Sequence, residues 1–157
     1  MESHTPVTTT LDALGVSYRL HLHQGPISSL EQAAHERGLS PEQIVRSLLF
    51  RLENAEFVLV LMPGPGKVSW PKLRRHLGVT RLTTAAAEKV EDVTGYPPGF
   101  VSPYGLTRPL RLLADLRLLR QTTVSIGAGI PQAGVILRTE DMLRTLQPEL
   151  GDFSEGG

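Results

Sequence analysis

The chain contains no cysteine, which excludes a thiol nucleophile and a thiolate metal site and leaves serine hydroxyls and histidine rings as the groups to consider first. Ser47 and Ser102 are the candidate nucleophiles, but neither lies in a G-x-S-x-G motif or beside a base that would identify a catalytic triad. His21 and His23 lie two residues apart on an expected strand and are suitable metal ligands, yet no carboxylate or third histidine has supporting spacing. We therefore expect no metal site.

Two glycine-rich segments resemble nucleotide-binding loops only in part. The segment PGPGKVS at 63–69 has Leu61 where a phosphate-binding loop requires its first glycine, and two prolines interrupt its junction with the following helix. The segment Gly127-Ala128-Gly129 lacks the third glycine of the dinucleotide fingerprint and comes late in the chain. Both patterns favour turns over a nucleotide triphosphate site or a Rossmann enzyme.

The composition is that of one globular domain. The 157 residues are 40% hydrophobic and 20% charged, which argues against a disordered or fibrous chain. The apolar runs are far shorter than the roughly 20 residues of a membrane-spanning helix, and the start MESHTPVTTT lacks the apolar centre of a signal peptide. We expect a single cytoplasmic domain over residues 1–157, with loose ends and no membrane contact.

Positive charge is concentrated in one segment, although 16 basic and 16 acidic residues balance over the whole chain. Residues 57–87 contain no acidic residue. They form a candidate basic face, but solvated helix charges explain them equally well, since five cations are too few for tight phosphate binding. These cations are Lys67, Lys72, Arg74, Arg75 and Arg81.

Hydrophobic periodicity and capping residues predict alternating helices and strands. Ser28 with Glu31 predicts a capped helix that ends at Gly38, and Ser69 predicts another that ends at Gly78. Further helices are expected over 8–14, from Ser40, from Thr83 or Thr84 to 93, and after Thr139. Strands are expected over 16–23, 47–52, 57–62, 110–114, 122–126 and 134–138.

Residues 94–106 form a loop with a defined shape, because three prolines and three glycines in thirteen residues restrict some backbone angles and free others. Such loops often carry function. The irregular mixture of elements predicts a mixed α/β fold, with a mixed, barrel-like β-sheet surrounded by helices.

Four segments in order resemble the YbaK/ProX family of aminoacyl-tRNA deacylases over about residues 8–147. The most specific is TGYPPGFVSPYG at 94–105, which is similar to the family's T-G-[YH]-x-x-G-x-[IV]-x-P-[FLY]-G. The others are SLEQAA at 29–34 with GLSPEQIVRSLLF at 38–50, KLRRHLG at 72–78, and VSIGAG at 124–129 with the DML helix at 141–143. Any one alone is weak, but the ordered set is specific.

The resemblance implies a pocket for the aminoacyl-adenosine end of a mischarged tRNA, hydrolysis of the aminoacyl ester and no cofactor. By position, Arg46 and Ser47 match the family's lysine and its hydroxyl neighbour. Arginine stays protonated and cannot act as a general base, although its guanidinium can position or stabilise charge. The implied catalytic set is Arg46, Ser47, Gly99 and Ser102, and the implied substrate-binding set is Tyr96, Val101, Pro103, Tyr104 and Gly127.

Two roles are open at this point. Tyr96 and Tyr104 can stack on adenine, and packing against the sheet explains them equally well. Lys72, Arg74 and Arg75 are expected to meet tRNA phosphates.

The leading interpretation is a trans-acting editing hydrolase for mischarged tRNA, whose partners are the acceptor end and a prolyl-type synthetase. A second interpretation is a non-catalytic member that binds tRNA or a synthetase, because Arg46 replaces the family lysine. A third is hydrolysis of an unrelated small ester or amide, since fold does not fix function.

Overall fold

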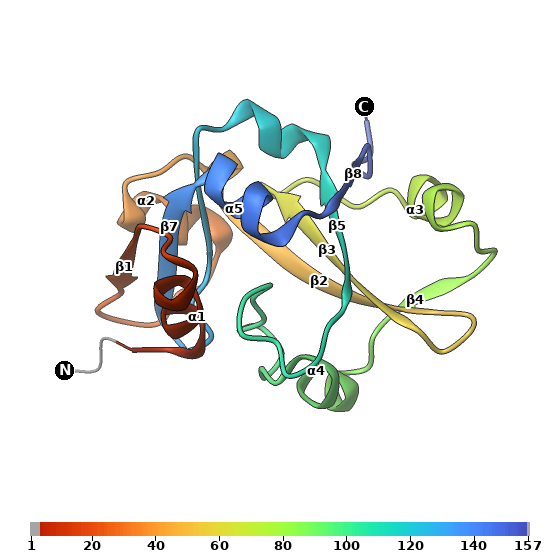
Figure 1. The fold of residues 1–157 in the computed structure, drawn as a ribbon. Coiled ribbons are helices and arrows are strands. Elements are labelled where there is room, and N and C mark those ends of the chain that lie inside the picture. Colours follow the sequence, from red (N-terminus) through yellow and green to blue (C-terminus); the bar gives the residue numbers. More distant parts are fainter. Residues whose placement is uncertain (1–3, 157) are drawn as a thin grey trace.

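The computed structural model describes residues 4–156 and contains two β-sheets with helices packed around them (Figure 1). No helix in this range is long and apolar enough to cross a membrane. The helices are α1 (Pro6–Leu14), α2 (Leu30–Arg37), α3 (Trp70–Leu77), α4 (Ala87–Thr94) and α5 (Thr139–Leu146), with 3-10 helices η1 (Pro41–Gln43) and η2 (Leu116–Arg120). The strands are β1 (Tyr18–Leu22), β2 (Val45–Leu52), β3 (Phe57–Pro63), β4 (Leu82–Thr84), β5 (Arg111–Asp115), β6 (Thr123–Gly127), β7 (Ala133–Arg138) and β8 (Glu149–Gly151).

The strands form a three-stranded antiparallel sheet in the order β1-β7-β6 and a five-stranded mixed sheet in the order β4-β2-β3-β5-β8. The predicted hairpin is β2–β3, and β3 pairs in parallel with β5. An isolated bridge between Ile44 and Ser125 joins the start of β2 to the three-stranded sheet. The mixed α/β class is confirmed, and the strands form two open sheets that meet at β2 and are not closed into a barrel.

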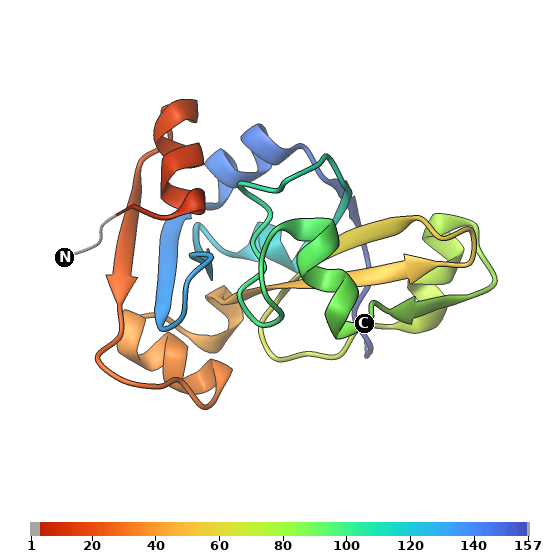
Figure 2. The same ribbon diagram turned by 90° about the horizontal axis from the view of Figure 1, so that it is seen from below.

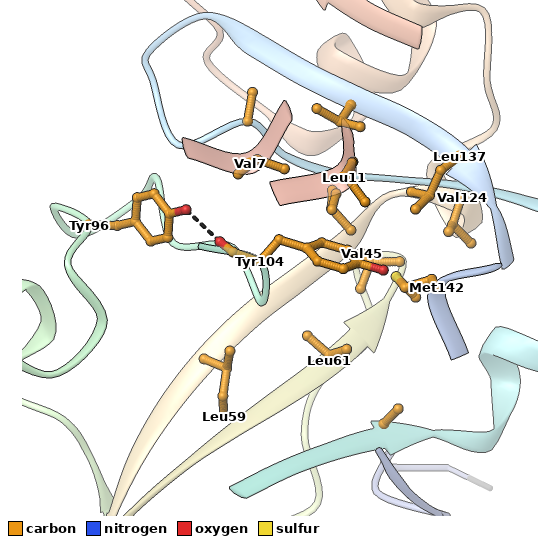
Figure 3. Close-up of a cluster of buried hydrophobic side chains, with 14 of the residues drawn as sticks. Val7, Leu11, Val45, Leu59, Leu61, Tyr96, Tyr104, Val124, Leu137 and Met142 are labelled. Carbon is orange, nitrogen blue, oxygen red and sulfur yellow. Dashed lines mark hydrogen bonds between the residues drawn. The ribbon is translucent and has the colours of Figure 1, made fainter. Parts of the chain in front are cut away.

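The hairpin is covered on both faces, as the continuous apolar run in β3 predicts. Leu59 and Leu61 join one buried cluster with α1, α4 and α5, whereas Val58 and Val60 join another with Leu73 of α3. Figure 2 shows the hairpin extending away from the sheet of β1 and β7. Figure 3 shows the larger cluster, in which side chains from both sheets meet.

Local capping explains where several helices begin and end. Helix α3 has the predicted Ser69 N-cap, whose Oγ accepts from Lys72 N at 3.3 Å, and ends at Gly78 in the left-handed conformation. The N-cap of α2 is Ser29 and not the predicted Ser28, because the Oγ of Ser29 accepts from Gln32 N at 3.0 Å. The helix expected from Thr83 or Thr84 begins only at Ala87, since these threonines pair with β2 as part of β4.

The C-terminal segment differs from the expected loose end, although residues 1–3 and 157 lie outside the described part of the chain. Strand β8 pairs in parallel with β5, and Phe153 is 1% exposed. The buried carboxylate of Asp115 accepts from Phe153 N at 2.8 Å, Ser154 Oγ at 2.9 Å and Arg117 N at 2.9 Å. One carboxylate therefore fixes the segment to the sheet.

We expect Asp115→Ala to lower the free energy of unfolding by about 3 kcal/mol, because it leaves two backbone N–H groups and a hydroxyl without their acceptor. Urea denaturation followed by circular dichroism measures the loss. The control is Asp92→Ala, which removes an exposed carboxylate 3.6 Å from Arg108 and should change stability by about 0.5 kcal/mol or less. Equal losses in the two variants would contradict the role of Asp115.

Candidate functional site

Two cavities meet along the first half of β2. Cavity A, about 590 Å³, lies between β2, the β6–β7 turn and Pro26–Ile27. Cavity B, about 560 Å³, lies between β2, Trp70 of α3 and Val90 of α4. Both volumes are in the range of small-ligand sites. Residues from β2 and from the Gly/Pro loop line both cavities: Arg46, Ser47, Leu48, Gly99 and Val101. We call these five residues the shared strip.

Arg46 is the charged group of the shared strip. Its Nη2 donates to the carbonyl oxygen of Gly66, while its buried Nε has no hydrogen-bond partner within residues 4–156. Burial lowers the pKa of Arg46, although a guanidinium in a protein still stays protonated near neutral pH. The side chain is thus a fixed cation with an unused donor, and it can serve as an electrostatic group but not as a base.

Ser47 adds a second unsatisfied group next to Arg46. Its Oγ is buried and has no partner among the described residues. Buried hydroxyls are normally hydrogen-bonded, and an exception calls for a functional explanation. Other atoms of Ser47 line both cavities, so the hydroxyl lies just behind their common wall.

The Gly/Pro loop reaches the strip through a close backbone approach. A Cβ placed on Gly127 would lie 3.2 Å from the carbonyl oxygen of Val101, so glycine lets the end of β6 pack against the loop. Gly99 has a φ of 90°, a backbone angle that residues with a side chain rarely adopt. The structure therefore brings together Arg46, Ser47, Gly99, Val101 and Gly127, all of which line cavity A.

The other predicted loop residues are buried and stabilise the loop without lining either cavity. Tyr96 and Tyr104 are 2% and 1% exposed, and neither lines cavity A or cavity B. The Tyr96 hydroxyl donates to the carbonyl of Tyr104 (Figure 3), and the Tyr104 hydroxyl bonds to Thr145 Oγ1 at 2.6 Å. Ser102 is fully buried, and its Oγ accepts from Tyr104 N at 3.3 Å, while Pro103 is also buried.

Glycines surround the Tyr96 ring and account for part of the motif. A Cβ on Gly105 would lie 2.5 Å from the Tyr96 hydroxyl oxygen, and one on Gly129 would lie 2.6 Å from its Cε1. Both glycines have positive φ. The tyrosine thus fastens the loop to the β6–β7 turn, and the two open alternatives for Tyr96 and Tyr104 resolve in favour of packing.

The predicted tRNA-binding residues lie on α3, next to cavity B. Lys72 Nζ donates to Asp152 Oδ2 and to the carbonyl of Ser154, both at 2.8 Å, so its charge is partly compensated. Arg74 is partly buried and Arg75 is exposed. Lys67 and Trp70 line cavity B itself. Contact of these cations with tRNA remains a prediction.

Sequence reasoning missed a polar network at cavity A. Arg37, the last residue of α2, lines cavity A and donates to His23 Nε2 at 3.0 Å and Ser125 Oγ at 2.9 Å. His23 in turn contacts Glu36 Oε1 at 2.7 Å. In the sequence, Arg37 reads as an ordinary cation at a helix end, and nothing in its spacing connects it with Ser125. Within residues 4–156, no group of three or more His, Cys, Asp or Glu side chains is placed to hold a metal ion.

The region that contains these residues is similar to proteins of known family. A family model described as an aminoacyl-tRNA editing domain matches residues 24–145, which include the whole shared strip. The proline–tRNA ligase of Bacillus licheniformis is 33% identical over 107 residues, which are 68% of this chain but only 18% of the ligase. A multifunctional Ser/Thr-tRNA deacylase, ProXp-y of Escherichia coli K12, is 27% identical over 155 residues, covering 96% of this chain and 92% of that protein.

A solved structure described as a candidate trans-editing enzyme for prolyl tRNA synthetase has a TM-score of 0.89 and 28% identity, and the match covers 96% of each chain. The likeness therefore extends over both sheets and both cavities.

We expect Tyr96→Phe to lower the free energy of unfolding by about 1 to 2 kcal/mol at pH 7, because the buried carbonyl of Tyr104 loses its donor. Burial raises the pKa of Tyr96 to about 12, above the value near 10 of an unfolded tyrosine. The protonated hydroxyl therefore stabilises the fold fully below pH 10, and this contribution is lost as the pH rises toward 12.

The measurement is chemical denaturation of wild type and Tyr96→Phe from pH 7 to pH 12, with Tyr18→Phe for comparison, a partly buried tyrosine whose hydroxyl donates to Asp12 Oδ1 at 2.9 Å. The gap between wild type and Tyr96→Phe should shrink above pH 10. A gap that stays constant to pH 12 would show that the Tyr96 hydroxyl is not buried as described.

Proposed function

The chain belongs to the aminoacyl-tRNA editing domain family, and from this premise we propose that it hydrolyses the aminoacyl ester of mischarged tRNA as a trans-acting deacylase. The observation that carries the proposal is the shared strip, where the unpartnered Arg46 Nε and Ser47 Oγ lie at the junction of two ligand-sized cavities. An aminoacyl ester joins an amino acid to the ribose of the terminal nucleoside. The two cavities that meet at this junction provide one site for each of these groups.

The two cavities differ in a way that assigns the halves of the substrate. Cavity B contains aromatic and apolar side chains, among them Phe50, Val68 and Trp70, which suit the face of a nucleobase. Cavity A adds the guanidinium of Arg37 to that of Arg46, which both cavities share, and we assign the aminoacyl group to cavity A. The ester carbonyl then lies over the shared strip.

In the proposed reaction a water molecule adds to the acyl carbon and the carbonyl oxygen becomes an oxyanion. The oxyanion then returns to a carbonyl as the bond between the acyl carbon and the ribose oxygen breaks, and a proton from the attacking water passes to the ribose oxygen. Arg46 donates to the oxyanion, since its charge and free N–H favour the negative transition state over the neutral ester. The Ser47 hydroxyl holds the substrate or the attacking water. Arg46 accepts no proton at any step.

The proposal extends to the rest of the substrate and its origin. The acceptor stem passes along α3, on which Arg75 is exposed and whose first residue, Trp70, lines cavity B. The substrate comes from a prolyl-type synthetase, to whose editing domain the chain is related. The reaction takes place in the cytoplasm, where tRNA is charged.

The Escherichia coli relative is named a Ser/Thr-tRNA deacylase, so seryl and threonyl esters are the first substrates to test.

The test measures release of labelled amino acid from a panel of mischarged tRNAs by wild type, Arg46→Ala and Arg46→Lys. Wild type should hydrolyse at least one ester, Arg46→Ala should lower kcat/KM by about 10² to 10³, and Arg46→Lys should retain activity within about tenfold because the cation is kept. The matched control is Arg51→Ala, an exposed arginine on the same strand, which should leave the rate unchanged.

Hydrolysis that is absent for every ester, or that is equal in wild type and Arg46→Ala, would overturn the proposal.

Charge reversal at Arg75 tests the path of the acceptor stem. We expect Arg75→Glu to raise KM for tRNA about three- to tenfold and leave kcat unchanged, because a phosphate contact strengthens binding equally in ground and transition states. Raising the salt concentration should reduce the difference in KM between Arg75→Glu and wild type. Arg19→Glu, on β1 at the opposite end of the molecule (Figure 1), is the control and should behave as wild type. An equal effect from both variants would place the stem elsewhere.

A further inference from the structure

We propose that Arg37 is the specificity-determining residue of cavity A, and that it selects amino acids whose side chains carry an oxygen acceptor over apolar side chains of the same shape. The inference rests on the proposed function and names the substrate class of the same site. It concerns a cluster separate from Arg46: the side chains of Arg37, His23, Glu36 and Ser125.

The guanidinium is held by three hydrogen bonds that it donates to three segments: the residue after β1, strand β6 and strand β7. Its Nε donates to His23 Nε2 at 3.0 Å, its Nη1 to Ser125 Oγ at 2.9 Å, and its Nη2 to the carbonyl of Ala133 at 3.4 Å. Arginine nitrogens only donate, so His23 Nε2 must be the acceptor and its Nδ1 carries the proton toward Glu36 Oε1. The network therefore fixes both the histidine tautomer and the position of the guanidinium.

The backbone beneath Arg37 is shaped to receive it. A Cβ placed on Gly134 of β7 would lie 2.1 Å from Arg37 Cζ and 2.5 Å from its Nε, so the guanidinium lies directly against the strand. Any side chain at 134 would displace it. Gly134 and the three hydrogen bonds together hold the cation at the wall of cavity A.

The held guanidinium still has unused donors. An arginine has five N–H groups, and the three contacts above leave two. Burial lowers the pKa of Arg37, with a smaller opposing effect from the charge of Glu36. The residues that line cavity A include Arg37 and Arg46 but no carboxylate. A ligand oxygen is therefore the partner that this wall lacks.

This arrangement discriminates by hydrogen bonding and by charge. Entry of an apolar side chain would remove water from the two remaining N–H groups without replacing it, whereas a hydroxyl or carboxylate oxygen would accept from them. Two guanidinium groups would also repel a cationic side chain. Threonine and valine have nearly the same shape and differ in the acceptor, so they form the most direct test pair.

The experiment measures calorimetric binding of stable amide analogues of aminoacyl-adenosine, with threonyl or valyl as the amino acid. Wild type should bind the threonyl analogue at least tenfold more tightly than the valyl analogue. In Arg37→Gln the preference should fall to within about twofold while valyl binding is kept, which shows that the variant is folded. Ser125→Ala, which removes one anchor, should reduce the preference by a smaller factor, and Arg19→Gln should not change it.

The preference is overturned if wild type binds the two analogues equally or binds neither, or if Arg37→Gln keeps the wild-type preference. Ester hydrolysis by wild type separates this inference from the proposed function. Equal hydrolysis of threonyl and valyl esters would leave the deacylase in place and remove the role of Arg37. A threonyl preference in binding without hydrolysis of any ester would keep the role of Arg37 and remove the deacylase.

Discussion

The buried Tyr96 side chain is the constraint on which the rest of the site depends. Its hydroxyl donates to the carbonyl of Tyr104, and its ring fits between Gly105 and Gly129, where no Cβ has room. This contact ties the Gly/Pro loop to the turn that follows β6. The loop is then held against β2, and its residues Gly99 and Val101 separate the two cavities. A core interaction thus determines the position of a surface site.

The site itself holds polar groups that the fold leaves incompletely satisfied. Arg46 Nε and Ser47 Oγ are buried without partners in the described part of the chain, and Arg37 has neutral acceptors where a carboxylate would usually be found. Such groups lower stability, and proteins keep them mainly where a ligand completes them. The stable parts of the fold are the covered hairpin, whose strand β2 carries Arg46 and Ser47, and the Asp115 network.

Sequence reasoning succeeded where a local signal was strong. The β2–β3 hairpin, helix α3 with its Ser69 cap and the irregular structure of the Gly/Pro loop followed from periodicity, capping and composition. It could not separate residues that line the cavities from residues that support the loop. Tyr96 and Val101 belong to one motif, and the sequence does not show that Tyr96 is buried while Val101 lines the cavities. Arg37 and Ser125 are 88 residues apart in the sequence, so only the structure reveals the contact between the end of α2 and β6.

The most direct test of this account is a crystal structure with a stable amide analogue of seryl- or threonyl-adenosine. The account predicts that the analogue spans the shared strip, with the amide oxygen within hydrogen-bond distance of Arg46, the amino acid in cavity A and the adenine beside Trp70 in cavity B. An analogue bound away from Arg46, or bound with its two halves exchanged between the cavities, would contradict it.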